Sequence, residues 1–174
     1  MSISIVCALM IGRKGSVGFP GKNIFPVLGR PLAAYPLLAA KESDHIGRIF
    51  VSTDCPKISK IAKDHDAELI DRPAELASKE ALGEDAFVHG YREIKRRLKE
   101  EGLDIELVVL LFANGATLNR DLIDKGIAVL RKNGSFDSAV TTSVYNMWSP
   151  LRARKLDADG CLHPMVPFET FGDP

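Results

Sequence analysis

Residues 12–23 read Gly-Arg-Lys-Gly-Ser-Val-Gly-Phe-Pro-Gly-Lys-Asn, a segment with four glycines and three cationic side chains. It follows the apolar run Ile3–Ile11, which is typical of a buried strand, and it precedes a predicted helix at Pro31–Ser43. In open α/β sheets, ligands bind at the carboxyl ends of the strands. Glycines let backbone N–H groups approach a phosphate closely, and cations neutralise its charge. The segment therefore predicts an anion-binding loop, although a surface turn rich in Gly and Pro has a similar composition.

Two common phosphate-binding loops do not fit this segment. The P-loop needs G-x-x-x-x-G-K-[ST], but Ser16 stands five positions before Gly21, and Asn23 follows Lys22. The dinucleotide fingerprint needs G-x-G-x-x-G, whereas the glycines here are spaced by three. The loop therefore belongs to neither of these classes.

The composition is that of an ordinary globular chain. Of 174 residues, 45% are hydrophobic and 26% are charged, and 23 Lys and Arg balance 23 Asp and Glu. A neutral chain has no bulk attraction for nucleic acid or for a membrane surface, so we expect neither as a partner. No apolar stretch is long enough for a membrane span, and no signal peptide is evident. Three widely separated cysteines indicate neither a zinc site nor a disulfide framework, and we expect a cytoplasmic protein.

Strand and helix patterns alternate along the first 145 residues. The expected strands are Ile3–Ile11, Arg48–Thr53, Ala67–Ile70, Glu106–Phe112 and Ser138–Ser143, and the expected helices are Pro31–Ser43, Pro56–His65, Glu84–Glu100 and Asp121–Lys132. This order predicts a three-layer α/β/α fold with a mainly parallel, Rossmann-like sheet. We expect residues 1–145 to form this domain. Residues 146–174 have no helical period and predict a hairpin around the Asp-Ala-Asp-Gly turn at 157–160.

The glycine-rich loop resembles that of the acylneuraminate cytidylyltransferases, which make CMP-sialic acids, and of the related CMP-Kdo synthetases. Those proteins open with a strand and a loop similar to Arg-x-Gly-Ser-Lys-Gly-x-Pro-x-Lys-Asn. The matching residues here are Arg13, Gly15, Ser16, Gly18, Pro20, Lys22 and Asn23. The chain departs from the pattern at Val17, where the family usually has lysine, and Lys14 is a candidate to compensate. The resemblance covers essentially the whole chain but only the first part of a typical family member, so we expect a fragment or a shortened relative.

A second segment, residues 71–83, also resembles the family, whose Arg-Pro-x-Glu-Leu-Ala run contacts cytosine. The resemblance implies nucleotide-binding roles for Arg72, Ala77, Ser78 and Ala81. From the residues alone, the segment is equally compatible with a loop that contacts a nucleotide and with a connecting loop that carries a helix cap. The guanidinium of Arg72 suits a base carbonyl or a phosphate oxygen.

Two strand ends carry further polar residues. The Val-Ser-Thr-Asp run ends at Asp54, for which we favour a helix cap over direct catalysis. Residues 110–118 depart from the family's usual Leu-Leu-Gln-Pro-Thr-Ser-Pro-Leu-Arg. Asn114 in this block has the polarity to hydrogen-bond a ribose or an acceptor, and it is equally suited to a turn before Gly115.

The resemblance implies transfer of CMP from CTP to a sialic acid-like or Kdo-like 2-keto-3-deoxy sugar acid, with release of pyrophosphate. We expect Arg13 and Lys22 to be the catalytic residues, because phosphoryl-type transfer depends on positioning and charge neutralisation. We expect Arg13, Lys22 and Asn23 to hold the triphosphate, with Gly15 and Ser16 as further nucleotide-binding residues of the same loop. The resemblance also implies Mg²⁺, with no ligand assigned, and a homodimer formed through the region after residue 145. Two alternatives remain: a nucleotidyltransferase of this fold with another nucleotide or a sugar 1-phosphate, and a non-catalytic nucleotide-binding module.

Overall fold

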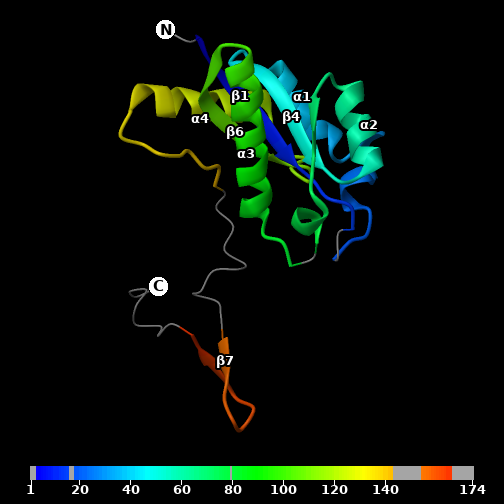
Figure 1. The fold of residues 1–174 in the computed structure, drawn as a ribbon. Coiled ribbons are helices and arrows are strands. Elements are labelled where there is room, and N and C mark those ends of the chain that lie inside the picture. The colour runs from blue at the N-terminus through cyan, green and yellow to red at the C-terminus, as the bar shows by residue number, and fades with distance from the viewer. Residues whose placement is uncertain (1–2, 16–17, 79, 143–153, 166–174) are drawn as a thin grey trace. The chain divides into compact units, whose positions relative to one another are not determined.

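A computed structural model of the chain describes residues 3–15, 18–78, 80–142 and 154–165. The chain divides into two compact units, residues 1–139 and 140–174. The first unit contains a four-stranded sheet in the order β5-β4-β1-β6 (Figure 1). Its strands are β1 (Ile3–Ile11), β4 (Ile46–Thr53), β5 (Glu68–Asp71) and β6 (Leu103–Phe112), and every pairing is parallel. The chain builds outward from β1 to β5 and then crosses to the other side of β1, so the sheet has a topological switch point between β1 and β6.

Four helices cover both faces of the sheet (Figure 1). They are α1 (Ala34–Glu42), α2 (Pro56–Asp64), α3 (Gly83–Glu100) and α4 (Arg120–Lys132). Alternate side chains of β1 enter two separate cores, because successive residues of a strand point to opposite faces. One core joins β1 to α1, α2 and α4 through Val6, Ala8, Met10, Leu37, Ile58, Ile61, Ile123 and Ile127, and the other joins it to α3 through Cys7, Leu9, Ile11, Ile94 and Leu98. The predicted three-layer fold with a parallel sheet is confirmed.

The first helix begins later than the sequence predicted. Pro31 lies in β3 (Arg30–Pro31), which pairs with β2 (Pro26–Val27) in a short hairpin. Leu28 and Gly29 connect the two strands with φ angles of 47° and 81°. Two-residue hairpin turns with left-handed backbone match the twist of the strands, but leucine rarely adopts that conformation. The sequence of this turn therefore gave no recognisable sign of a hairpin.

The predicted strand at Ser138–Ser143 is wrong over the part that the structure describes. Residues 138–142 form no strand, and Ser143 lies outside the described residues. Strand propensity reflects packing against neighbouring strands more than the backbone itself, so composition alone was insufficient.

In the second unit, β7 (Arg154–Leu156) and β8 (Leu162–Pro164) form an antiparallel hairpin. The turn is held by Asp157, whose carboxylate accepts hydrogen bonds from the backbone N–H groups of Asp159 (3.0 Å) and Cys161 (2.7 Å). The domain boundary at residue 145 and the dimerisation role of this region stay predictions. Among the helices that the structure describes, none is long and apolar enough to cross a bilayer.

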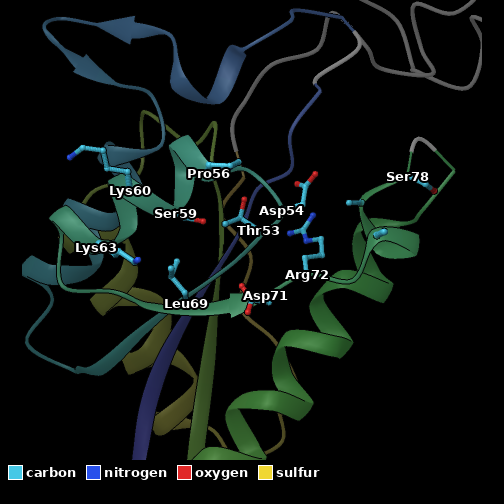
Figure 2. Close-up of a pocket in the computed structure, with 12 residues that line it drawn as sticks. Thr53, Asp54, Pro56, Ser59, Lys60, Lys63, Leu69, Asp71, Arg72 and Ser78 are labelled. Atoms are coloured by element: carbon cyan, nitrogen blue, oxygen red, sulfur yellow. The ribbon is translucent and has the colours of Figure 1, made fainter.

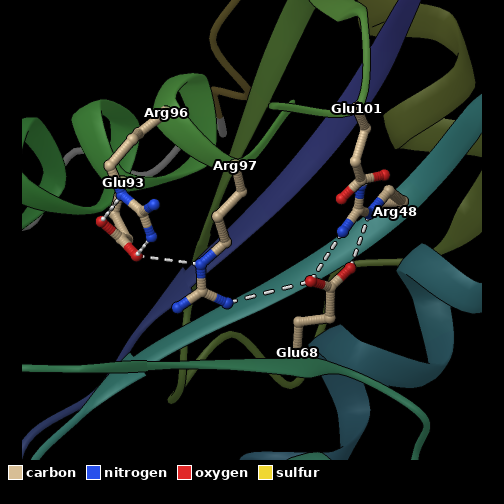
Figure 3. Close-up of polar contacts among 6 residues, drawn as sticks. All are labelled: Arg48, Glu68, Glu93, Arg96, Arg97 and Glu101. Carbon is tan, nitrogen blue, oxygen red and sulfur yellow. Dashed lines mark hydrogen bonds and ion pairs between the residues drawn. The ribbon is translucent and has the colours of Figure 1, made fainter. Parts of the chain in front are cut away.

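A cluster of ion pairs ties the edge strand β5 to its neighbours (Figure 3). Arg48 of β4 donates to both carboxylate oxygens of Glu68 in β5, at 2.6 and 2.8 Å, and to Glu101 at 2.7 Å. Arg97 of α3 lies 3.8 Å from Glu68 and also contacts Glu93. Hydrogen bonds from the neighbouring arginines lower the pKa of Glu93 to about 2, so its carboxylate stays charged. The positive charge of Arg96 and Arg97 is thus partly neutralised by carboxylates of the same helix.

The close approach of α3 to the sheet depends on Gly90. A Cβ at this position would lie 2.7 Å from a methyl group of Leu9, which is fully buried in β1. We expect Gly90→Ala to destabilise the protein by about 1–3 kcal/mol through overpacking, although alanine favours helices. Urea unfolding measures this change.

The matched control is Gly126→Ala in α4, where the added Cβ would meet only Ala139 at 3.9 Å. That substitution should stabilise the protein by about 0.5–1 kcal/mol. Equal effects of the two substitutions would show that the contact with Leu9 does not limit the packing of α3.

Candidate functional site

Three loops meet at the carboxyl edge of the sheet. The backbone N–H of Gly12, after β1, donates to Ser52 O at 3.2 Å, and the N–H of Arg72, after β5, donates to Thr53 O at 3.3 Å. Gly12 also allows the end of β1 to approach the turn after β6, because a Cβ there would lie 2.8 Å from that of Ala113. The glycine-rich loop is therefore fixed beside the ends of β4, β5 and β6.

Within the glycine-rich loop, two glycines have left-handed backbone. The φ angles of Gly15 and Gly21 are 83° and 73°. Gly21 precedes a short 3-10 helix, η1 (Lys22–Ile24), which places Lys22 and Asn23 half-buried at the inner end of the loop. The amide nitrogen of Asn23 lies 3.5 Å from Arg13 O, across the mouth of the loop. Ser16 and Val17 lie outside the described residues.

Arg13 joins the glycine-rich loop to the segment after β5. Its Nη1 donates to the carbonyl oxygens of Ser78 and, at 3.3 Å, of Ala77. The Ser78 hydroxyl in turn accepts from the backbone N–H of Ala81 at 3.2 Å. Four residues that the sequence assigned to the nucleotide site are thus brought together around one guanidinium. A guanidinium has five donors, so Arg13 retains N–H groups for a ligand.

Arg72 is anchored to the end of β4. Its Nη2 donates to Ser52 O at 2.7 Å, and its Nε to the Ser52 hydroxyl at 3.3 Å. Burial lowers the pKa of Arg72, and the nearby Asp54 carboxylate opposes that shift. Figure 2 shows the two side chains on neighbouring strand ends. Arg72 therefore fixes the floor of the site with part of its guanidinium, and its predicted contact with a base stays a prediction.

The predicted helix cap at Asp54 is wrong. Helix α2 is preceded by Cys55, and the Thr53 hydroxyl accepts the backbone N–H of Cys55 at 3.0 Å. The Asp54 carboxylate instead accepts the backbone N–H of Lys14 at 2.8 Å. Asp54 stands one residue too early to cap a helix that begins at Pro56. The Val-Ser-Thr-Asp run signalled a polar strand end, but no local pattern connects it to a residue forty positions earlier.

Two hollows lie on either side of these contacts. The larger, of about 910 Å³, is drawn in Figure 2 and is lined by Thr53, Asp54, Pro56, Ser59, Lys60, Lys63, Leu69, Asp71, Arg72, Ala74, Ala77 and Ser78. The smaller, of about 450 Å³, is lined by Arg13, Lys14, Gly15, Gly21, Asn23, Ile24, Cys55, Pro56, Lys57 and Ile58. Asp54 lines the larger hollow, and its hydrogen-bond partner Lys14 lines the smaller one. Likewise, Ser78 lines the larger hollow and its partner Arg13 lines the smaller one. The hydrogen bonds between the loops thus form the boundary between the two hollows.

The site is rich in positive charge, although the carboxylates of Asp54 and Asp71 also line it. In the part of the chain that the structure describes, no ion pair joins an acidic side chain to the five cations Arg13, Lys14, Lys22, Lys57 and Arg72. Cations elsewhere in the fold, such as Arg48 and Arg131, pair closely with carboxylates. Clustered cations of one sign create a field that attracts anions. The arrangement is therefore suited to a polyphosphate ligand.

Asn114 lies apart from this cluster. It is exposed in the turn after β6, and its own carbonyl accepts the N–H of Ala116 at 3.1 Å. It lines neither hollow. The turn geometry is the alternative that the sequence had left open, and a contact with ribose or acceptor stays a prediction. Among the described residues, no group of three or more His, Cys, Asp or Glu side chains could hold a metal ion.

Comparison with known proteins identifies the family. A family model described as cytidylyltransferase matches residues 7–157, and the chain belongs to that family. This confirms the resemblance inferred from the glycine-rich loop.

Several curated relatives are named for CMP transfer to sugar acids. The pseudaminic acid cytidylyltransferase and UDP-2,4-diacetamido-2,4,6-trideoxy-beta-L-altropyranose hydrolase of Helicobacter pylori is 26% identical over 86% of this chain and 28% of its own length. The N-acylneuraminate cytidylyltransferase of Escherichia coli is 32% identical over 48% of this chain and 20% of its own length. The CMP-N,N'-diacetyllegionaminic acid synthase of Legionella pneumophila is 25% identical over 90% of this chain and 65% of its own length. The chain thus spans less than two thirds of each relative.

Two solved structures share the fold. A CMP:2-keto-3-deoxy-manno-octonic acid synthetase, complexed with CTP, superposes with a TM-score of 0.60 at 17% identity, over 76% of this chain and 50% of its own. A cytidylyltransferase from Leptospira borgpetersenii gives a TM-score of 0.59 at 19% identity, over 75% of this chain and 50% of its own. At these identities the likeness shows the architecture of the sheet and helices.

The hydrogen bond at Thr53 gives a direct test. Thr53→Val keeps the shape of a buried side chain but leaves the N–H of Cys55 without its acceptor, so we expect a loss of about 1–3 kcal/mol in unfolding free energy. Thermal and urea unfolding measure it. Asp54→Ala leaves this bond intact and should cost less stability. A larger loss for Asp54→Ala than for Thr53→Val would contradict the importance given to the Thr53 hydroxyl.

Proposed function

We propose that this chain supplies the nucleotide-binding part of an enzyme that transfers CMP from CTP to a 2-keto-3-deoxy sugar acid and releases pyrophosphate. One observation carries the proposal. Unpaired cations and left-handed glycines converge at the carboxyl edge of the sheet, in a chain that belongs to the cytidylyltransferase family. The names of the relatives, which act on pseudaminic, legionaminic and acylneuraminic acids, support a sugar acid as the acceptor.

The residues divide into two functional groups in this proposal. Arg13 and Lys22 neutralise the phosphates as catalytic residues, with Gly15, Ser16 and Asn23 in the same loop. Arg72, Ala77 and Ser78 line the larger hollow and form the base pocket together with Ala81, and Asn114 faces the ribose or the acceptor. The sugar-acid hydroxyl attacks the α-phosphorus, a new P–O bond forms, and the bond to the departing pyrophosphate breaks. Positioning and charge neutralisation are the protein's main contributions to such a step.

Mg²⁺ is proposed as the cofactor, because its charge offsets that of the triphosphate. The described residues contain no cluster able to hold it alone. Magnesium commonly binds through substrate phosphates and only one or two carboxylates. We therefore assign it no ligand among these residues.

We place the protein in the cytoplasm. Cys7 and Cys55 are buried and free, and burial raises the pKa of Cys7 to about 11, so that side chain remains a thiol. Free cysteines without a disulfide framework suit a reducing compartment.

Calorimetric titration with CTP, UTP, ATP and GTP, each with Mg²⁺, tests the function. We expect selective binding of CTP, and Lys22→Ala should weaken it about tenfold or more, because a charge-assisted contact is worth roughly 1.5–3 kcal/mol. The control is Lys125→Ala, an exposed lysine of α4 far along the chain from the loop. Preference for another nucleotide would replace CTP in the proposal. No binding of any nucleotide would contradict it.

We also propose that the protein is a homodimer through the region after residue 145. Leu156 and Leu162 are cross-strand partners in the β7–β8 hairpin, and their side chains are 70% and 68% exposed. An isolated two-stranded hairpin is marginally stable in water, so these leucines need a partner surface. We expect light scattering to give a dimer for the wild type and a monomer for Leu162→Glu. Lys155→Ala on the same hairpin is the control, and a monomeric wild type would refute the proposal.

A further inference from the structure

The Asp54 carboxylate does not cap helix α2, which is the role that its position in the sequence suggests. Helix α2 begins at Pro56 without a side-chain cap bond, and the Asp54 Oδ1 instead accepts the backbone N–H of Lys14 at 2.8 Å. This bond joins the end of β4 to the glycine-rich loop two residues beyond the bond from the Gly12 N–H to Ser52 O. It is formed by a backbone N–H, so it constrains the path of the loop whichever side chain stands at position 14.

Lys14 lies between two residues of the loop that are themselves constrained. Its preceding neighbour, Arg13, holds the carbonyls of residues 77 and 78, and its following neighbour, Gly15, begins the left-handed turn with a φ of 83°. The loop is therefore tied to the end of β4 through its backbone and to the segment after β5 through a side chain, just before it turns. Without the hydrogen bond from the Lys14 N–H to Asp54, the orientation of the N–H group of Gly15, which follows, would no longer be fixed.

Asp54 is also an unexpected charge for a polyphosphate site. It lines the larger hollow beside Arg72 (Figure 2), and a carboxylate repels phosphates. Electrostatics alone predicts that loss of this charge strengthens CTP binding. A positioning role for Asp54 predicts weaker CTP binding instead. Without the hydrogen bond from the Lys14 N–H, the loop would have to become ordered when the ligand binds, and this costs binding free energy.

We propose that Asp54 is a positioning residue, which holds the glycine-rich loop in the conformation that binds the triphosphate through its hydrogen bond to the Lys14 N–H. This inference rests on the proposed function, since the ligand is the CTP of that proposal. Asp54 acts through the loop and is assigned no contact with the nucleotide.

The experiment compares Asp54→Ala with Asp54→Asn in the full chain. Alanine removes the acceptor, whereas asparagine keeps an acceptor oxygen and removes only the charge. In the protein without nucleotide, we expect amide hydrogen exchange at Lys14 to be about tenfold faster in Asp54→Ala and close to wild type in Asp54→Asn. Calorimetry with CTP and Mg²⁺ should show affinity weakened about fivefold or more by alanine and largely restored by asparagine.

Asp104→Ala is the matched control, because Asp104 is exposed near the amino end of β6, where its carboxylate accepts the backbone N–H of Ile105 at 2.8 Å. It should leave both the exchange at Lys14 and the CTP affinity unchanged. Melting temperatures of all variants show whether a change is global.

Three results would overturn the inference: unchanged exchange at Lys14 in Asp54→Ala, equal or tighter CTP binding by that variant, or failure of asparagine to restore binding. The two proposals fail separately. If the wild type binds none of the four nucleotides, the proposed function is refuted and the nucleotide role of Asp54 with it. The exchange at Lys14 then still decides whether Asp54 holds the loop.

Discussion

The parallel ladder that joins β1 to β4 and β6 is the constraint on which the whole site depends. Nine residues of β1 pair with β6 and six pair with β4, with one register shift in each pairing, and Ile11 lies between Ser52 and Phe112. Parallel strands place their carboxyl ends at one edge. As a result, loops that are separated by tens of residues in the sequence begin within hydrogen-bonding distance of one another. The ladder is fixed in turn by β1, whose alternate side chains are locked into two cores and cannot shift by one residue without exposing both.

On this rigid frame, cations outnumber carboxylates around the two hollows. The five cations have no ion-pair partner among the described residues. At the amino end of β5, by contrast, Arg48 forms close ion pairs with Glu68 and Glu101. Repulsion among neighbouring cations opposes folding, and an anionic ligand would relieve it. The fold tolerates this arrangement because the guanidiniums of Arg13 and Arg72 are hydrogen-bonded to carbonyl oxygens, which offset part of their charge.

Much of this could be predicted from the sequence, for identifiable reasons. The apolar runs Ile3–Ile11 and Leu107–Phe112 are long and continuous, so they signal buried parallel strands without ambiguity. The Arg-x-Gly-Ser and Arg-Pro-x-Glu-Leu-Ala patterns are dense enough to identify the family. Three features could not be predicted because they depend on more than the local sequence: the left-handed backbone of Leu28, the absence of a strand at residues 138–142, and the Lys14 N–H as the donor to Asp54. Each of these depends on a tertiary contact or on a conformation that the residue type disfavours.

The site residues also show why the two arginines and the lysines are not interchangeable here. A planar guanidinium donates several hydrogen bonds in fixed directions, so Arg13 and Arg72 can each hold the backbone of a neighbouring segment while remaining charged. An ammonium on a flexible stem offers a point charge with little directional constraint. Lys14 and Lys22 therefore suit a ligand whose phosphates move during a reaction, whereas the arginines suit the fixed walls. The geometry of the site follows this difference: the arginines bridge elements, and the lysine side chains stand free of ion pairs in the described structure.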